Sequence, residues 1–168
     1  MRDYSSIDVR AGGRTREERM SALVDALWDA LAEQGISWIG FYFGPGQTLD
    51  DGRTVGASEM LLGPCRNKPA CSPIGLHGAC GRSWREKRTL VVGDVADLGA
   101  DYVACDPRDR SEVVVPLFDE RGACYGVLDA DSFDVGAFDT RDGDELNSVL
   151  LRSGLTSKRV SGPAPLVI

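Results

Sequence analysis

The sequence contains no apolar run near the roughly 18 to 20 residues that a membrane span needs. Its opening, MRDYSSIDVR, lacks the apolar segment of a signal peptide. It also has no run of five or more basic residues, and its formal net charge is −7. An acidic chain without a basic patch is a poor ligand for phosphate backbones or anionic lipid. We therefore expect a cytoplasmic protein that binds neither nucleic acid nor membranes.

Internal repeats and an interdomain linker are also absent, which predicts one domain for the 168 residues. We expect an N-terminal extension over 1–14, the domain over 15–157 and a loosely held C-terminal tail over 158–168. Within the domain, the order of helices, strands and a hairpin predicts the α+β class, with helices packed on an antiparallel sheet.

Hydrophobic periodicity and turn residues place the elements. A helix should follow the capping-box pair Thr15 and Glu18 and stop at Gly35. A closing helix should begin at Asp139 or Thr140. Shorter elements complete the pattern: strands at 36–43, 59–63 and 89–95, a helix at 80–88, and a hairpin whose strands, 112–118 and 123–131, flank the turn DERG.

Closely spaced cysteine pairs are missing: the five cysteines include no C-x-x-C, and His77 is the only histidine. Cytoplasmic thiols are normally reduced and the count is odd, so a structural disulfide framework is not expected. A zinc site from Cys71, His77, Cys80 and Cys105 is possible in composition but unusual in spacing. We expect no metal.

Cysteines in polar, Gly/Pro-rich segments favour redox chemistry instead. A thiolate that attacks an oxidised sulfur needs exposure and a second thiol within reach, because the sulfenic acid it becomes is discharged by condensation to a disulfide. Cys105 is followed by Arg108 and Arg110, whose charges would favour its thiolate. Cys124 falls in an expected strand and is interpreted as inert core, whereas Cys65 fits either role. The alternative for any single cysteine is a small buried hydrophobe.

Acidic and aromatic residues form a second candidate set. Glu112 opens one hairpin strand, and Asp129 and Asp131 lie two apart on the other, so these two share a face. Neighbouring carboxyl groups raise one another's pKa, so that one could donate a proton to a leaving oxygen while another holds an ammonium group. Trp38 and Tyr42 lie on one strand face and would form an apolar wall. The alternatives are solvated strand ends for the acids and core packing for the aromatics.

A family pattern is carried by WIGFY at 38–42, LGPCRNKPAC at 62–71, GACGRS at 78–83, VACDPRDRSEVVVPLF at 103–118 and GVLDADS at 126–132. In this order the segments resemble the free methionine-(R)-sulfoxide reductases, enzymes built on a GAF domain. The combination of KPAC, of ACD followed by RSE, and of LDADS is far more specific than any one motif.

The resemblance implies reduction of free methionine sulfoxide by a homodimeric, thioredoxin-dependent enzyme that needs no cofactor. Cys105 would attack the substrate, Cys71 would resolve the product as a disulfide, and Cys80 would assist or take over a role. A protonated carboxyl group, Glu112 or one of the aspartates, would donate to the sulfoxide oxygen. The family's carboxylate and aromatic pocket positions fall on Glu112, Asp129, Asp131, Trp38 and Tyr42.

Three departures from the family pattern bear on specificity. The segment between Cys71 and Cys80 is one residue shorter, the segment before Cys105 is one residue longer, and Cys65 replaces a position that is usually aromatic. These changes keep open a diverged thiol enzyme for another small oxidised metabolite. A third hypothesis is a non-catalytic GAF sensor of a small ligand or of redox state, against which the retained cysteines and carboxylates count.

Overall fold

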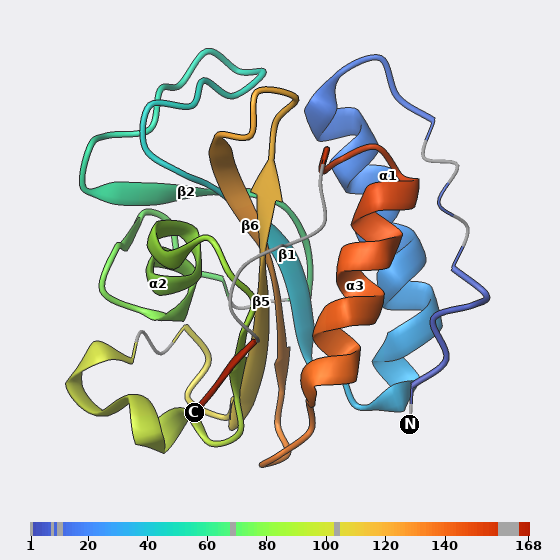
Figure 1. Cartoon of the computed structure of the whole chain (residues 1–168), viewed down its shortest axis with the longest axis vertical. Helices are drawn as coiled ribbons and strands as arrows, with labels where there is room; N and C mark the ends of the chain where they lie inside the picture. Colours follow the sequence, from blue (N-terminus) through green and yellow to red (C-terminus); the bar gives the residue numbers. More distant parts are fainter. Residues whose placement is uncertain (1, 8, 10–11, 68–69, 103–104, 158–164) are drawn as a thin grey trace.

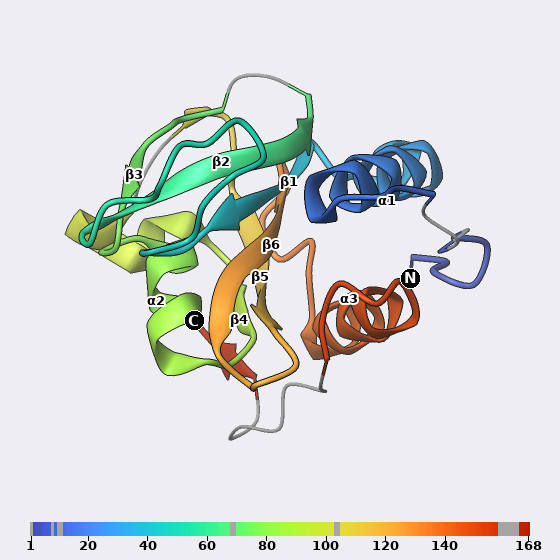
Figure 2. The same cartoon turned by 90° about the horizontal axis from the view of Figure 1, so that it is seen from above.

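The computed structural model describes residues 2–7, 9, 12–67, 70–102, 105–157 and 165–168. Within these ranges a seven-stranded sheet, in the order β3-β2-β1-β6-β5-β4-β7, separates two helical layers. Figures 1 and 2 show helices α1 (Arg16–Leu31) and α3 (Thr140–Arg152) on one face and α2 (Ala79–Glu86) on the other. The strands are β1 (Trp38–Phe43), β2 (Glu59–Arg66), β3 (Ile74–Gly75), β4 (Leu90–Val92), β5 (Ser111–Phe118), β6 (Cys124–Ser132) and β7 (Leu166–Val167), and two 3₁₀ helices are η1 (Ala32–Gln34) and η2 (Val95–Asp101). The α+β class predicted from the sequence is confirmed.

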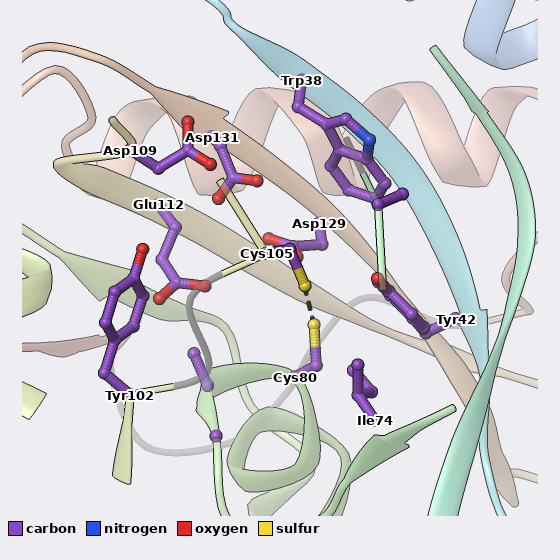
Figure 3. Close-up of a pocket in the computed structure, with 13 residues that line it drawn as sticks. Trp38, Tyr42, Ile74, Cys80, Tyr102, Cys105, Asp109, Glu112, Asp129 and Asp131 are labelled. Carbon is purple, nitrogen blue, oxygen red and sulfur yellow. Dashed lines mark hydrogen bonds between the residues drawn. The ribbon is translucent and has the colours of Figure 1, made fainter. Parts of the chain in front are cut away.

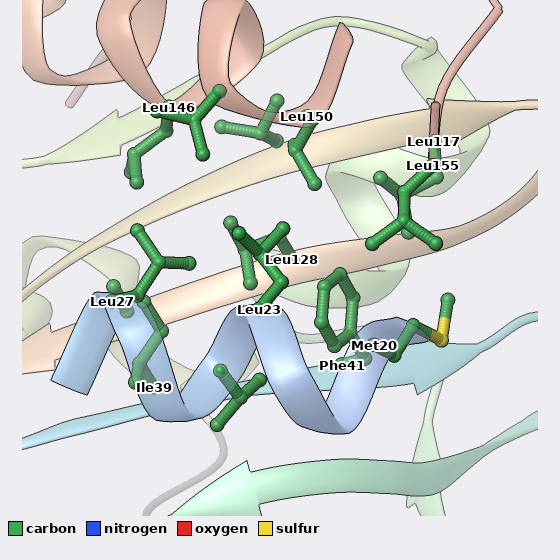
Figure 4. Packing of buried hydrophobic residues seen from close by; sticks show 14 of the residues in the cluster. Met20, Leu23, Leu27, Ile39, Phe41, Leu117, Leu128, Leu146, Leu150 and Leu155 are labelled. Atoms are coloured by element: carbon green, nitrogen blue, oxygen red, sulfur yellow. The ribbon is translucent and has the colours of Figure 1, made fainter. Parts of the chain in front are cut away.

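Side-chain alternation along β1 divides the interior into two clusters. Ile39 and Phe41 point toward α1 and α3 and join the larger cluster, part of which Figure 4 shows. Trp38 and Tyr42 point the opposite way and join a smaller cluster on the α2 side. The sheet is therefore buried on both faces, and the second face carries the polar residues described below.

Both long helices begin where the sequence predicts. The Thr15 hydroxyl accepts from the Glu18 amide at 3.1 Å, and the reciprocal bond completes a capping box. Asp139 caps α3 in the same way, with Asp142 as its partner. The first helix runs through η1 and stops at Gly35, whose φ of 92° suits glycine.

Strands β5 and β6 form the predicted antiparallel hairpin. Glu112 lies opposite Asp131, and Val114 lies opposite Asp129. Strand β1 pairs with the other edge of β6, which puts Trp38 opposite Asp131. One row across three neighbouring strands thus contains Trp38, Asp131 and Glu112.

The expectation of a loosely held tail is wrong for the last residues of the chain. Strand β7 pairs with β4, and this pairing is parallel, so the sheet is mixed rather than purely antiparallel. The amides of Leu166 and Ile168 donate to the carbonyls of Thr89 and Val91 at 3.1 and 3.0 Å. Without these bonds β4 would be an unpaired edge strand. The earlier part of the predicted tail, 158–164, lies outside the described residues.

The segment predicted as an N-terminal extension packs against the start of α3. The Tyr4 hydroxyl donates to Asp142 at 2.7 Å, and the Arg2 guanidinium donates to the same carboxylate and to the carbonyl of Ala137.

Among the described residues, no helix has the length and apolar character to cross a bilayer.

Candidate functional site

A cavity lies between the second face of the sheet and α2 (Figure 3). Strands β1, β5 and β6 form its floor, and the first residues of α2 and the segment before β5 form its walls. Its lining consists of Trp38, Tyr42, Ala70, Ile74, Gly78, Ala79, Cys80, Tyr102, Cys105, Asp109, Glu112, Asp129 and Asp131. This lining contains seven of the eight predicted site residues, and the eighth, Cys71, is bonded to one of them.

Three carboxyl groups meet on the floor of the cavity. Glu112 projects from β5, and Asp129 and Asp131 project from alternate positions of β6, with carboxylate oxygens within 4.8 Å of one another. Glu112 and Asp129 are each 6% exposed, while Asp131 is partly exposed. One oxygen of Asp129 is buried and has no hydrogen-bond partner among the described residues. Such an atom is costly in an empty site and is available to a ligand.

Burial and mutual repulsion keep these groups protonated to higher pH than usual. Burial raises the pKa of Glu112 well above its ordinary range, and the charges of Asp131 and Asp109 raise it further. Burial also raises the pKa of Asp129, followed by the charge of Glu112, although a hydrogen bond from Cys80 acts in the opposite direction. The pKa of Asp131 is raised by burial and then by Asp129. The cavity can therefore donate a proton and, once ionised, hold a cation.

Two aromatic rings form the apolar side of the cavity. The centroids of Trp38 and Tyr42 are 6.0 Å apart on the cavity face of β1, as the strand period predicts. The residue between them on this face is Gly40, where a Cβ would lie 2.5 Å from both the Trp38 ring and the Cys65 Cβ. The glycine lets the indole lie flat against the strand. The buried Trp38 Nε1 has no acceptor among the described residues.

Cys71 and Cys105 are joined by a disulfide across 34 positions, with Cα atoms 5.4 Å apart. The disulfide between these two cysteines, which the resemblance implied, is confirmed. Their roles as attacking and resolving thiols stay predictions.

Cys80 behaves differently from the other two. It lies in the first turn of α2, is 6% exposed, and its Sγ donates to Asp129 at 3.2 Å. A helix N-terminus favours a thiolate by only about 0.3–1 kcal/mol. Burial outweighs this, and with the charges of Asp129 and Glu112 it raises the pKa of Cys80 well above its usual value. Cys80 is therefore held as a thiol, which makes it a poor first nucleophile.

Two polar residues of the cavity lining, Asp109 and Tyr102, were missed by the sequence interpretation. Asp109 is buried, accepts a hydrogen bond from the Ser37 hydroxyl at 2.9 Å, and has a pKa raised by its burial. Tyr102 faces the acids from the other wall (Figure 3). Asp109 lies inside the motif DPRDRSE, three residues before Glu112, but it lies between two arginines, a pattern that is typical of a solvated ion pair.

The two arginines predicted to act on Cys105 have other partners. Arg108 pairs with Asp106 at 2.6 Å, and Arg110 pairs with Asp94 at 3.2 Å. Each arginine is thus paired with a carboxylate, and the predicted effect of their charges on the Cys105 thiol stays a prediction.

The remaining cysteine and histidine candidates lie outside the cavity. His77 is exposed, and Cys71 and Cys105 are bonded to each other, so the Cys3His zinc arrangement is not formed. Cys65 lies on β2 opposite Gly40 and packs behind Trp38. Cys124 lies in a strand, as predicted, and is the first residue of β6, but it is only partly buried and is not core.

The chain is similar in sequence and in structure to several known proteins. The chain matches the GAF domain family over residues 13–150. The free methionine-R-sulfoxide reductase of Saccharomyces cerevisiae is 34% identical over 133 residues, which cover 77% of this chain and 67% of that protein. The free methionine-R-sulfoxide reductase from Neisseria meningitidis, solved in complex with its substrate, has a TM-score of 0.71 and 33% identity, covering 88% of this chain and 83% of that one. The protein called fRMsr of Staphylococcus aureus, also in complex with substrate, has a TM-score of 0.75 and 28% identity, covering 94% and 97% of the two chains.

Proposed function

Since this chain belongs to the GAF domain family and, within it, to the free methionine-R-sulfoxide reductases, we propose that it reduces free L-methionine-(R)-sulfoxide to methionine. The observation that carries the proposal is the position of the Cys71–Cys105 disulfide: Cys105 lines the same cavity as three carboxyl groups and an aromatic wall. Each of these groups has a task in the reduction of a zwitterionic sulfoxide.

The first task is to hold the substrate. A substrate ammonium group favours ionisation of nearby carboxyl groups and then pairs with the carboxylates. Among the described residues, the lining of the cavity contains no basic side chain that would compete for them. Asp129 and Asp131 are assigned this role. Trp38 and Tyr42 present an apolar surface that suits the S-methyl end of the substrate.

The second task is oxygen transfer. The Cys105 thiolate attacks the sulfoxide sulfur while a protonated carboxyl group, assigned to Glu112, donates a proton to the sulfoxide oxygen. Oxygen passes to the sulfur of Cys105, methionine leaves as the thioether, and Cys105 becomes a sulfenic acid. The substrate sulfur gains the two electrons that the thiolate loses.

The third task is to reset the enzyme. The Cys71 thiol condenses with the sulfenic acid, which releases water and forms the disulfide, and an external dithiol then reduces this disulfide. We assign thioredoxin as the cytoplasmic dithiol. A homodimer belongs to the same proposal and is tested by the mass measured in light scattering.

The activity is tested with an equimolar mixture of the R and S sulfoxide epimers of free L-methionine, with dithiothreitol as reductant. We expect half of the sulfoxide to disappear, because a chiral cavity accepts one epimer, with an equal amount of methionine formed. Chiral chromatography should identify the remaining half as the S epimer. Consumption of both epimers at similar rates, or of neither, contradicts the proposal. Replacing dithiothreitol by thioredoxin, thioredoxin reductase and NADPH tests the electron donor separately.

A further inference from the structure

Tyr42 does more in this structure than line the apolar wall. Its hydroxyl donates a hydrogen bond to the main-chain carbonyl of Cys71 at 2.9 Å, across 29 positions of the chain. The residue is 3% exposed. A cavity-wall residue thus holds the backbone of one of the two cysteines that form the disulfide.

The residues that follow Cys71 are fixed to the sheet as well. The Leu62 amide on β2 donates to the Ser72 hydroxyl at 3.1 Å. Two residues further on, β3 begins and pairs with β2, with Ile74 opposite Met60. The Cys71 segment is therefore attached to β1 through Tyr42 and to β2 through Ser72.

We propose that Tyr42 is a positioning residue for disulfide formation: its hydroxyl holds the Cys71 backbone so that the Cys71 thiol meets the sulfenic acid on Cys105. The assignment of the attacking and resolving thiols rests on the proposed function. The positioning itself rests on the hydrogen bond and on the disulfide.

The Tyr42 hydroxyl is suited to act as a lasting hydrogen-bond donor. Burial, together with the charges around the cavity, raises the pKa of Tyr42 far above its usual value, so the phenol keeps its proton and donates throughout the working pH range. Intramolecular condensation depends steeply on how well the two groups are pre-oriented. Loss of one neutral hydrogen bond typically changes a rate or an equilibrium by about two- to tenfold. Loss of the Tyr42 hydrogen bond should therefore slow closure without abolishing it.

The test uses Tyr42→Phe, which keeps the ring and removes only the hydroxyl. Reduced protein is treated with one equivalent of hydrogen peroxide, which oxidises the Cys105 thiolate to sulfenic acid and releases hydroxide. Closure then consumes the Cys71 thiol and releases water. Dimedone trapping and thiol counting at successive times give the closure rate. We expect Tyr42→Phe to close about five- to tenfold more slowly than the parent and to accumulate the dimedone adduct.

A matched control is available on the opposite face of the sheet. The buried Tyr125 hydroxyl donates to the carbonyl of Leu155, so Tyr125→Phe makes the same chemical change away from the disulfide and should leave the closure rate unchanged. Ser72→Ala removes the second attachment at an exposed residue and should slow closure in the same direction as Tyr42→Phe.

An unchanged closure rate in Tyr42→Phe would overturn the proposal and leave Tyr42 as a wall of the cavity only. Because peroxide replaces the sulfoxide, this outcome is independent of the substrate. A protein that failed to reduce methionine sulfoxide but showed slow closure in Tyr42→Phe would contradict the proposed function and support the positioning role.

Discussion

Glu112 lies directly opposite Asp131 in the β5–β6 ladder, and both side chains face the same cavity. Like charges opposite each other in a sheet are destabilising, and burial increases the cost of ionising either of them. The arrangement therefore lowers the stability of the fold at high pH. It also suits a site that binds a cation and donates a proton.

Replacing Glu112 should stabilise the fold in a pH-dependent way. The folded-state pKa of Glu112 is raised, so the native state binds more protons than the unfolded state, and stability falls as pH rises from about 4 through the folded pKa. Glu112→Gln imitates the protonated acid and should avoid this loss. We expect its melting temperature to match the parent near pH 4 and to exceed it by about 2–4 °C or more at pH 8.

Exposed Glu120 supplies the matched control, because Glu120→Gln should leave the melting temperature within about a degree of the parent at both pH values. A Glu112→Gln protein that is less stable than the parent at pH 8 would show that the Glu112 carboxylate is a net stabilising group.

The same substitution should also reduce activity. Sulfoxide reduction by Glu112→Gln should fall by about 10²-fold or more, as expected for a lost general acid.

Asp109 should extend the alkaline limit of activity to higher pH, in addition to the larger effect of burial. Its charge raises the pKa of Glu112, Asp129 and Asp131. Asp109→Asn keeps an acceptor for Ser37 but removes that charge, so the proton-donating group should ionise at lower pH. We expect the alkaline limb of the kcat/KM profile to move to lower pH. A profile that stays in place would mean that Asp109 does not act on the proton donor.

The glycine beneath the indole should be intolerant of any side chain. In Gly40→Ala the new Cβ would lie 2.5 Å from the Trp38 ring and from Cys65, so the ring must shift into the cavity. Overpacking of this kind costs about 1–3 kcal/mol. We expect KM for the sulfoxide to rise about tenfold or more. Gly12→Ala, where a Cβ meets nothing within 4 Å, should leave KM unchanged.

Substitution of Cys105 and substitution of Cys71 should impair turnover in different ways. Cys105→Ser should abolish turnover, because the attacking sulfur is lost. Cys71→Ser should release one methionine per enzyme and leave a sulfenic acid that dimedone traps, while Cys124→Ser should retain full turnover. Quenched-flow product counts distinguish these outcomes. Sustained turnover by Cys105→Ser would transfer the attacking role to another thiol.

Local patterns correctly predicted where several cavity side chains lie and where two helices begin. The period of two along a strand put Asp129 and Asp131 on one face and paired Trp38 with Tyr42, and short-range capping predicted the starts of α1 and α3. These features depend on residues that are close in sequence, where backbone geometry alone determines which side chains meet.

Long-range features were not predictable in the same way. Asp109 lines the cavity and accepts a hydrogen bond from Ser37, 72 positions earlier, and no local pattern encodes that contact. Strand β7 forms because β4 has an open edge, which the tail sequence does not reveal. The attachment of Tyr42 to Cys71 likewise depends on how a loop returns over β1.

The measurement that tests the central claim most directly compares free L-methionine-(R)-sulfoxide with its N-acetyl derivative. Acetylation removes the positive charge and leaves the sulfoxide, the S-methyl group and the stereochemistry intact. If Asp129 and Asp131 hold the ammonium group, kcat/KM for the N-acetyl compound should fall by at least about 10²-fold, because these carboxyl groups lose their charged partner. Equal kcat/KM for the two compounds would contradict a cavity built to recognise the free amino acid.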